Sequence, residues 1–229
     1  MRNYLREAIL AGTASGVKFK VKGNLHDFPF TTAKQGDFRI VADVQNASFA
    51  YAPAFLLPKD SPPWPMLTDL SGELVIDRNV LQVKGASARV AGMPGLRVGK
   101  ADAVVDSLYR GATVAVSVDA QGPLADVLGV VNGSPLGPLM GKALDRATAA
   151  GAADYKFKLA FPIAAVDRAT VRGSIALAGN DIQITPESPK LGRARGHHPF
   201  FGDRFRGDGC TGPCAGRRRA AGRGHGQPR

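Results

Sequence analysis

Cysteine and histidine are almost absent from the first 191 of the 229 residues. Both cysteines, Cys210 and Cys214, come after that point, and His26 is the single histidine before it. A chain of this length can bury a sizeable core without disulfides, and the lack of cysteine is compatible with an oxidising compartment. A lone histidine beside Asp27 supplies neither a zinc ligand set nor a Ser-His-Asp triad. We therefore expect no disulfides, metal or cofactor in residues 1–191.

The motifs of common enzyme classes are also missing. The sequence has no Gly-x-Ser-x-Gly elbow and no phosphate loop that ends in Gly-Lys-Ser/Thr. A Gly-x-Gly-x-x-Gly begins at Gly207, but no strand precedes it, so the spacing is typical of chance in a Gly-rich segment. The carboxylate pairs Asp102/Asp106 and Glu73/Asp77 lie on expected strands, where solvent-facing charge is ordinary. We expect no catalytic residues and no enzyme.

Long hydrophobic runs are lacking as well. No segment approaches the roughly 20 apolar residues that a membrane-spanning helix needs. At the start, Arg6 and Glu7 interrupt the sequence before an apolar stretch of signal-peptide length can form. The sequence as written therefore predicts a chain without an anchor or an export signal.

After Leu191 the sequence contains no Leu, Ile, Val or Met in 38 residues. Nine arginines and two aspartates give residues 192–229 a net charge of +7, which leaves +4 for residues 1–191. Such a composition cannot bury enough apolar surface to fold, so we expect an Arg/Gly-rich disordered tail. Out-of-frame translation of GC-rich codons gives this composition, and we favour a frameshifted end. Two alternatives stay open: RNA binding through arginine and aromatic residues, and a zinc site at Cys210-x3-Cys214.

The sequence is rich in alternating apolar and polar residues. Residues 155–161 place Tyr, Phe, Leu and Phe at odd positions and lysines or alanine between them, and residues 17–22 and 113–118 alternate in the same way. This period of two indicates strands with one wet and one apolar face. Further alternating segments and Gly-rich turns recur up to residue 185. The prediction is a mainly β fold, an antiparallel meander of hairpins.

Some segments break this period. A helix is expected at residues 4–14, and a short helical insert of two helices at about 122–150, because Leu124, Val127, Leu128 and Val131 share a helix face. A hairpin is expected around Arg78-Asn79, and another that joins 170–177 to 181–185 across Gly179-Asn180. The insert is too short to cover every strand. The remaining apolar face would pack against a second layer, or it would form a lipid-lined groove.

The order of several short motifs resembles the AsmA-like proteins of YhdP type. The motifs, spread over residues 1–191, are Tyr4-Leu5-Arg6, Gly23-x-Leu25-x-x-Phe28-Pro29-Phe30, Gly36-x-Phe38, Tyr51-x-Pro53, Trp64-Pro65, Leu70-x-Gly72-x-Leu74, Gly122-Pro123-Leu124, Ser134-Pro135-Leu136, Leu159-x-Phe161-Pro162-Ile163 and Val171-x-Gly173.

The resemblance implies an elongated, curved β-sheet whose hydrophobic groove carries phospholipid acyl chains through the periplasm. The full-length parent would be anchored in the inner membrane and would act between the inner and outer membranes. Residues 1–191 would then be an internal β-groove segment, with the remainder of the long parent protein as a partner. The alternatives are nucleic-acid binding through the tail, which we consider unlikely, and a structural scaffold domain without a ligand. The groove-lining candidates are Val17, Phe19, Val21, Phe38, Ile40, Val114, Val116, Phe157, Leu159 and Phe161.

Overall fold

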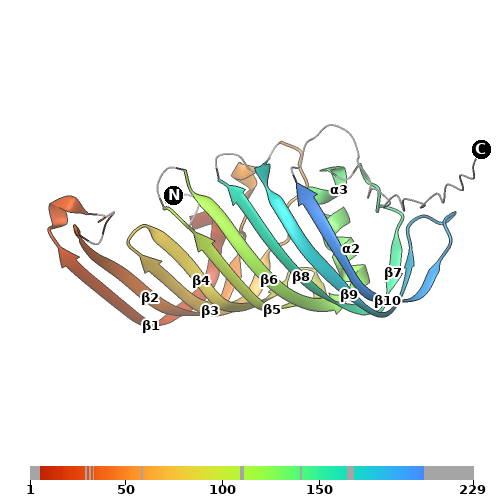
Figure 1. Cartoon of the computed structure of the whole chain (residues 1–229), viewed down its shortest axis with the longest axis horizontal. Helices are drawn as coiled ribbons and strands as arrows, with labels where there is room; N and C mark the ends of the chain where they lie inside the picture. Colours follow the sequence, from red (N-terminus) through yellow and green to blue (C-terminus); the bar gives the residue numbers. More distant parts are fainter. Residues whose placement is uncertain are drawn as a thin grey trace, which may run out of the picture.

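The protein is built around one open antiparallel sheet (Figure 1). It is described from a computed structural model, which covers residues 6–203 apart from 29, 31, 33, 58, 109–110, 140 and 164–167. The ten strands follow the order β1-β2-β3-β4-β5-β6-β8-β9-β10, and the short β7 pairs with β9. The strands are β1 (Ile9–Gly23), β2 (Gly36–Phe49), β3 (Leu67–Asp77), β4 (Val80–Val90), β5 (Met93–Val105), β6 (Thr113–Pro123), β7 (Thr148–Ala150), β8 (Ala152–Pro162), β9 (Thr170–Gln183) and β10 (Leu191–Asp203).

This arrangement confirms the predicted meander, because neighbours in the chain are neighbours in the sheet almost throughout. Short helices lie between the strands: η1 (Leu25–Asp27), η2 (Ala54–Leu56), α2 (Leu124–Asn132) and α3 (Leu136–Leu139). The tight hairpin at Arg78-Asn79 forms as expected, with Asp77 opposite Val80.

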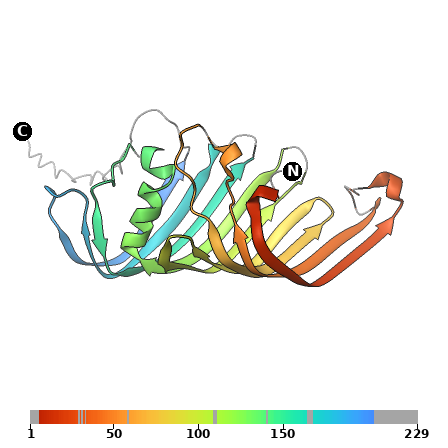
Figure 2. The ribbon, with the colours of Figure 1, turned by 180° about the vertical axis from the view of Figure 1, so that it is seen from behind.

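The sheet is sharply bent along a line that crosses its first four strands. Each strand shifts register there, and each places one residue at positive φ: Gly16 (58°), Asn46 (52°), Asp69 (52°) and Gly85 (56°). A bulge adds a residue to one strand and bends it. Because the bulges are aligned, the whole sheet curves, and both views show strands that descend and turn along its lower edge (Figures 1 and 2).

Small side chains fill the inside of the bend. Ala42, Ala47, Ala86 and Ala88 are all at most 6% exposed. At Gly72 a Cβ atom would lie 2.8 Å from the Cα of Ala86, so the backbones of β3 and β4 leave no room for a side chain there. The sharp bend therefore depends on alanine and glycine at these positions.

Two local predictions of helix are wrong. Residues 6–8 are helical, but the expected helix at 4–14 is replaced from Ile9 onward by β1, which pairs with the end of β2. The second helix of the insert, expected at 139–150, does not form: α3 lies just before it, and turns and β7 occupy the described part of that range. Local propensity is a weak prior, and a partner strand outweighs it.

The expected hairpin at Gly179-Asn180 is a kink inside the single strand β9. Gly179 has φ of 113°, and the buried Asn180 side chain donates to the carbonyl of Ala152 at 3.1 Å and accepts from the amide of Ala178 at 3.0 Å. Before the kink β9 pairs with β8, and after it with β7. The asparagine satisfies backbone groups between strands, so the chain continues across the sheet.

The sheet also continues past residue 191, where a disordered tail was expected. Residues 191–203 form β10, which pairs with β9 from Leu191 opposite Ile182 to Asp203 opposite Thr170. The prediction of disorder is therefore wrong for residues 192–203. An edge strand needs backbone pairing more than aliphatic side chains, and β9 offers a free edge. The rest of the predicted tail, including Cys210 and Cys214, lies outside the described residues.

Candidate functional site: one apolar face of the bent sheet

The register of the sheet brings the groove candidates together. Residues directly opposite each other in an antiparallel pair place their side chains on the same face. Starting at Phe19, direct pairs follow one another across seven strands without a polar residue. This first row consists of Phe19, Ile40, Ile76, Leu81, Val105, Val114 and Phe161.

A second row runs parallel to the first on the same face. It crosses seven strands from β2 to β9 and is again entirely apolar: Ala42, Leu74, Val83, Ala103, Val116, Leu159 and Val171. Val21 opposite Phe38, and Val118 opposite Phe157, extend the face on either side. We call the side of the sheet that carries these residues the apolar face, and the opposite side the charged face.

Nine of the ten sequence candidates therefore lie on the apolar face. The exception is Val17, which falls in the register shift next to Gly16 and has no directly opposed partner. Sequence reasoning missed the contributions of β3, β4, β5 and β9. Their alternation was visible at Leu74-Val75-Ile76 and Leu81-Gln82-Val83, but parity alone does not say which residues share a face with Phe19.

The apolar face is unevenly covered. Among the candidates, Phe38, Ile40, Val114, Val116, Phe157, Leu159 and Phe161 are half-buried. On β1, at the sheet edge, Phe19 is 77% exposed, and Val17 and Val21 are also exposed. Large aliphatic and aromatic side chains are thus left in contact with solvent on a continuous surface, which marks a binding surface more often than a passive one.

Helix α2 covers the same face towards the other end of the sheet. Its Leu124 packs with Leu96, Ala153 and Tyr155, and its Val127 and Val130 contact this cluster. Figure 2 shows α2 in front of the strands of this end. The predicted apolar stripe of the helix is thus confirmed at Leu124 and Val127. The second layer expected as an alternative to a groove is present here but does not reach β1.

Tyr155 is the most buried large side chain beneath α2. Its hydroxyl donates to the carbonyl of Gly122 at 3.3 Å. Burial raises the pKa of Tyr155 to about 12, with smaller contributions from the carboxylates of Asp126 and Asp154. At neutral pH the phenol is therefore uncharged, as an apolar surface requires.

Aromatic rings close the apolar face at the tip of the β1–β2 hairpin. Phe28 contacts both Phe30 and Phe38 edge to face, with ring centroids 5.7 and 5.2 Å apart. Phe30 is fully buried, and its ring lies so close to Gly23 and Gly36 that a Cβ at either position would come within 3.0 Å of it.

The charged face carries ion pairs on the same strands. Asp37 accepts from Lys20 at 2.9 Å and lies 3.6 Å from Arg78, which also reaches Asp77 at 3.5 Å. Asp77 in turn pairs with Arg39 at 2.9 Å. The hydrogen bond from Lys20 holds the pKa of Asp37 below its usual value of 3.8. The sheet therefore has one side suited to water and one suited to hydrocarbon.

Metal-ligand clusters and membrane-spanning helices are both absent from the parts of the chain that the structure describes. Within them there is no group of three metal-ligating side chains. None of the described helices is both long and apolar enough to cross a membrane. The zinc and RNA-binding alternatives involve residues 192–229, of which 204–229, including both cysteines, lie outside the described residues, so both remain untested predictions.

The fold and this face define a class of protein: an open, bent antiparallel sheet that exposes a continuous apolar surface on one side. The profile of the YhdP protein family matches residues 1–215, nearly the whole sequence, and the chain belongs to that family. The match confirms the resemblance and extends beyond residue 191. No curated protein and no solved structure matches the chain.

Proposed function

We propose that the chain is a non-enzymatic segment of a periplasmic protein that moves phospholipids between the inner and outer membranes and so maintains the outer-membrane barrier. The observation that carries the proposal is the first apolar row, which crosses seven strands and ends on exposed side chains of β1. Membership of the YhdP family supports it. The partners would be phospholipid acyl chains, the remainder of the parent protein and both membranes, with an inner-membrane anchor elsewhere in that parent.

The physical basis is the apolar area that half-buried side chains still present to water. An acyl chain that covers it gains roughly 25 cal/mol per Å², or about 0.8 kcal/mol per buried methylene group. The two rows offer this contact on strand after strand, and no polar side chain interrupts them. Affinity would thus come from many small contributions, without a single recognition residue.

Photo-crosslinking from the two sides of one strand tests the proposal. Benzoylphenylalanine is placed either at Phe157, on the apolar face, or at Lys156, on the charged face of the same strand. The chain is irradiated in cells and analysed by mass spectrometry. We expect a phospholipid adduct at position 157 and not at 156. Equal adducts at both positions, or none at 157, would rule out lipid contact on this face.

A charge on the apolar face should disrupt the same contact. Leu159→Asp places a carboxylate in the middle of the second row, where burial against a lipid tail is costly. We expect a severe loss of lipid cross-linking in this variant. Ala160→Asp is the matched control, because Ala160 is the next residue and its side chain is on the charged face. Unchanged cross-linking in Leu159→Asp would remove the residue from the proposed path.

A further inference from the structure

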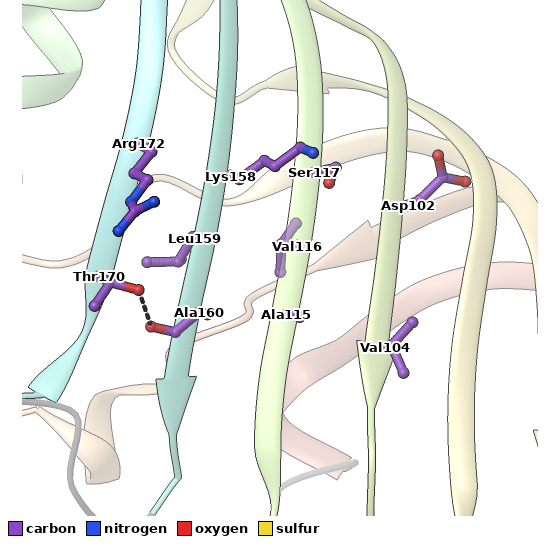
Figure 3. A pocket seen from close by; sticks show the side chains of 10 residues that line it. All are labelled: Asp102, Val104, Ala115, Val116, Ser117, Lys158, Leu159, Ala160, Thr170 and Arg172. Carbon is purple, nitrogen blue, oxygen red and sulfur yellow. Dashed lines mark hydrogen bonds between the residues drawn. The ribbon is translucent and has the colours of Figure 1, made fainter. Parts of the chain in front are cut away.

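A shallow hollow of about 310 Å³ lies on the charged face, over strands β5, β6, β8 and β9 (Figure 3). Two consecutive cross-strand rows build it, and Val116 and Leu159 of the second apolar row also line it. The row that carries charge is Asp102, Ser117, Lys158 and Arg172, and the row beside it is Val104, Ala115, Ala160 and Thr170. Ala115 and Ala160 have short side chains, so the middle of the uncharged row is low, and longer side chains surround it.

Two cations border this hollow without an acidic partner among the side chains that the structure describes. Lys158 and Arg172 are directly opposite each other on β8 and β9, an arrangement of like charges that destabilises a sheet. Neither makes an ion pair within the described ranges. The Lys158 ammonium extends over β6 beside Ser117, and the Arg172 guanidinium lies beside Thr170 (Figure 3).

Asp102, the acidic residue among those that line the hollow, is already engaged. One oxygen of Asp102 accepts from the backbone amide of Gly85, at the bulge of β4, at 2.8 Å. The other lies 3.8 Å from the ammonium of Lys100. By contrast, Lys156, on the same face of β8, has its own carboxylate in Asp119, at 3.4 Å. Counted over the described side chains, the hollow therefore has a net positive charge that its neighbours do not neutralise.

We propose that this hollow binds a phosphate-bearing group on the charged face. A guanidinium pairs with phosphate through two parallel hydrogen bonds, and an ammonium adds a point charge. The Ser117 hydroxyl supplies a further donor on the same row. The volume suits a phosphate and a small substituent. The charged row lies on the opposite side of the sheet from the proposed lipid path, so its two cations can be varied separately from that path, although Val116 and Leu159 belong to both linings.

The phosphate could belong to a soluble anion or to a lipid headgroup at a membrane surface. Two experiments on the full chain distinguish these sources. Inorganic phosphate is titrated into isotope-labelled chain while the backbone amides of residues 115–117, 158–160 and 170–172 are followed by NMR. Separately, binding to phosphatidylglycerol vesicles is measured by sedimentation. Both are repeated with Lys158→Gln/Arg172→Gln and with Lys156→Gln as the control, and circular dichroism verifies folding.

We expect phosphate to shift the amides around the hollow and the double variant to bind about tenfold more weakly or worse, because it loses two charge-assisted contacts. Lys156→Gln should bind like the unmodified chain. Vesicle binding with this same dependence, in the absence of a phosphate response, would assign the site to a lipid headgroup. If neither probe binds, or if the double variant and Lys156→Gln bind equally, the proposal is overturned.

Discussion

The ring of Phe200 on β10 lies over the α-carbon of Gly173 on β9, and the two residues are directly opposed in the sheet. On its other side Gly173 is opposed by Phe157. Gly173 has no side chain and lies between two aromatic residues, so the Phe200 ring can pack over it. Aromatic residues pack over glycines of neighbouring strands in the same way in other sheets. This contact joins β10, a strand with few apolar residues, to the apolar face.

Gly173→Ala should weaken the attachment of β10. The added Cβ would meet the Phe200 ring and the carbonyl oxygen of Lys156, so strand or ring must shift. We expect a loss of about 1–3 kcal/mol in the free energy of unfolding, as for other overpacked sites, and faster amide hydrogen exchange in residues 191–203. Gly99→Ala is the control, because its Cβ would have no neighbour closer than 3.8 Å. Equal stability of the two variants would contradict the packing role of Gly173.

Gly85→Ala should measure the conformational cost of the bend. A Cβ at Gly85 would meet no atom within 4 Å, so the cost arises only from its φ of 56°. A left-handed conformation costs a non-glycine residue about 1–2 kcal/mol, and we expect that loss in urea denaturation. Asn46→Gly, at the corresponding bulge of β2, should be neutral or slightly stabilising, since glycine adopts its φ of 52° readily. A Gly85→Ala variant as stable as the parent would show that the bulge relaxes.

Asp37→Asn should alter stability in acid. The pKa of Asp37 is lowered mainly by its hydrogen bond from Lys20, so its ionised form stabilises the folded state above the unfolded pKa of 3.8. That contribution is lost as the pH falls through the lower folded pKa. The variant should therefore lose less stability than the parent on acidification below about pH 4. Urea midpoints measured across this range would test it, and parallel curves would show that the Lys20–Asp37 pair contributes nothing.

Tyr155→Phe should reduce the loss of stability in alkali. The unfolded phenol ionises near pH 10 and the folded one near 12, so stability falls as the pH rises through this window. Phenylalanine does not ionise, so the variant should not lose stability in this way. At neutral pH the substitution costs about 1 kcal/mol, because the hydrogen bond to Gly122 is lost. Phenolate absorbance during titration would report the high pKa. Burial also raises the pKa of Tyr51 to about 12. The variant therefore keeps one tyrosine whose phenol ionises at high pH. A Tyr155 that titrates near pH 10 would contradict its burial.

The sequence predicted best where a pattern is both local and repeated. Phe19, Phe38, Val116 and Leu159 stand at alternate positions of clear strands, and the register places them on one face. The alternation determines which residues share a side within one strand. The alternation does not determine which residues of different strands lie on the same face of the sheet. Leu74 and Val171 are therefore not among the groove candidates predicted from the sequence.

The failures have a common physical origin in pairing partners that lie outside the segment concerned. Ile9 to Ala14 alternates weakly and has helical propensity, yet its backbone pairs with residues near Phe49. Asn180 and its glycine match a turn, but the asparagine bonds the backbone of Ala152, nearly thirty positions earlier. For β10 the composition argued against folding, and an existing sheet edge supplied the missing interactions. Each outcome depends on a partner segment whose pairing the segment's own composition does not reveal.

The first apolar row crosses seven strands, and six spacings of about 4.8 Å give it a span of roughly 29 Å. This is close to the thickness of the hydrocarbon core of a bilayer, about 30 Å. A fatty tail lying along the row would meet nearly equivalent neighbours after each step of one strand. The interaction energy of the tail would then change little with its position along the row. Such a surface would let the tail slide from strand to strand, because no single position binds it much more tightly than the next.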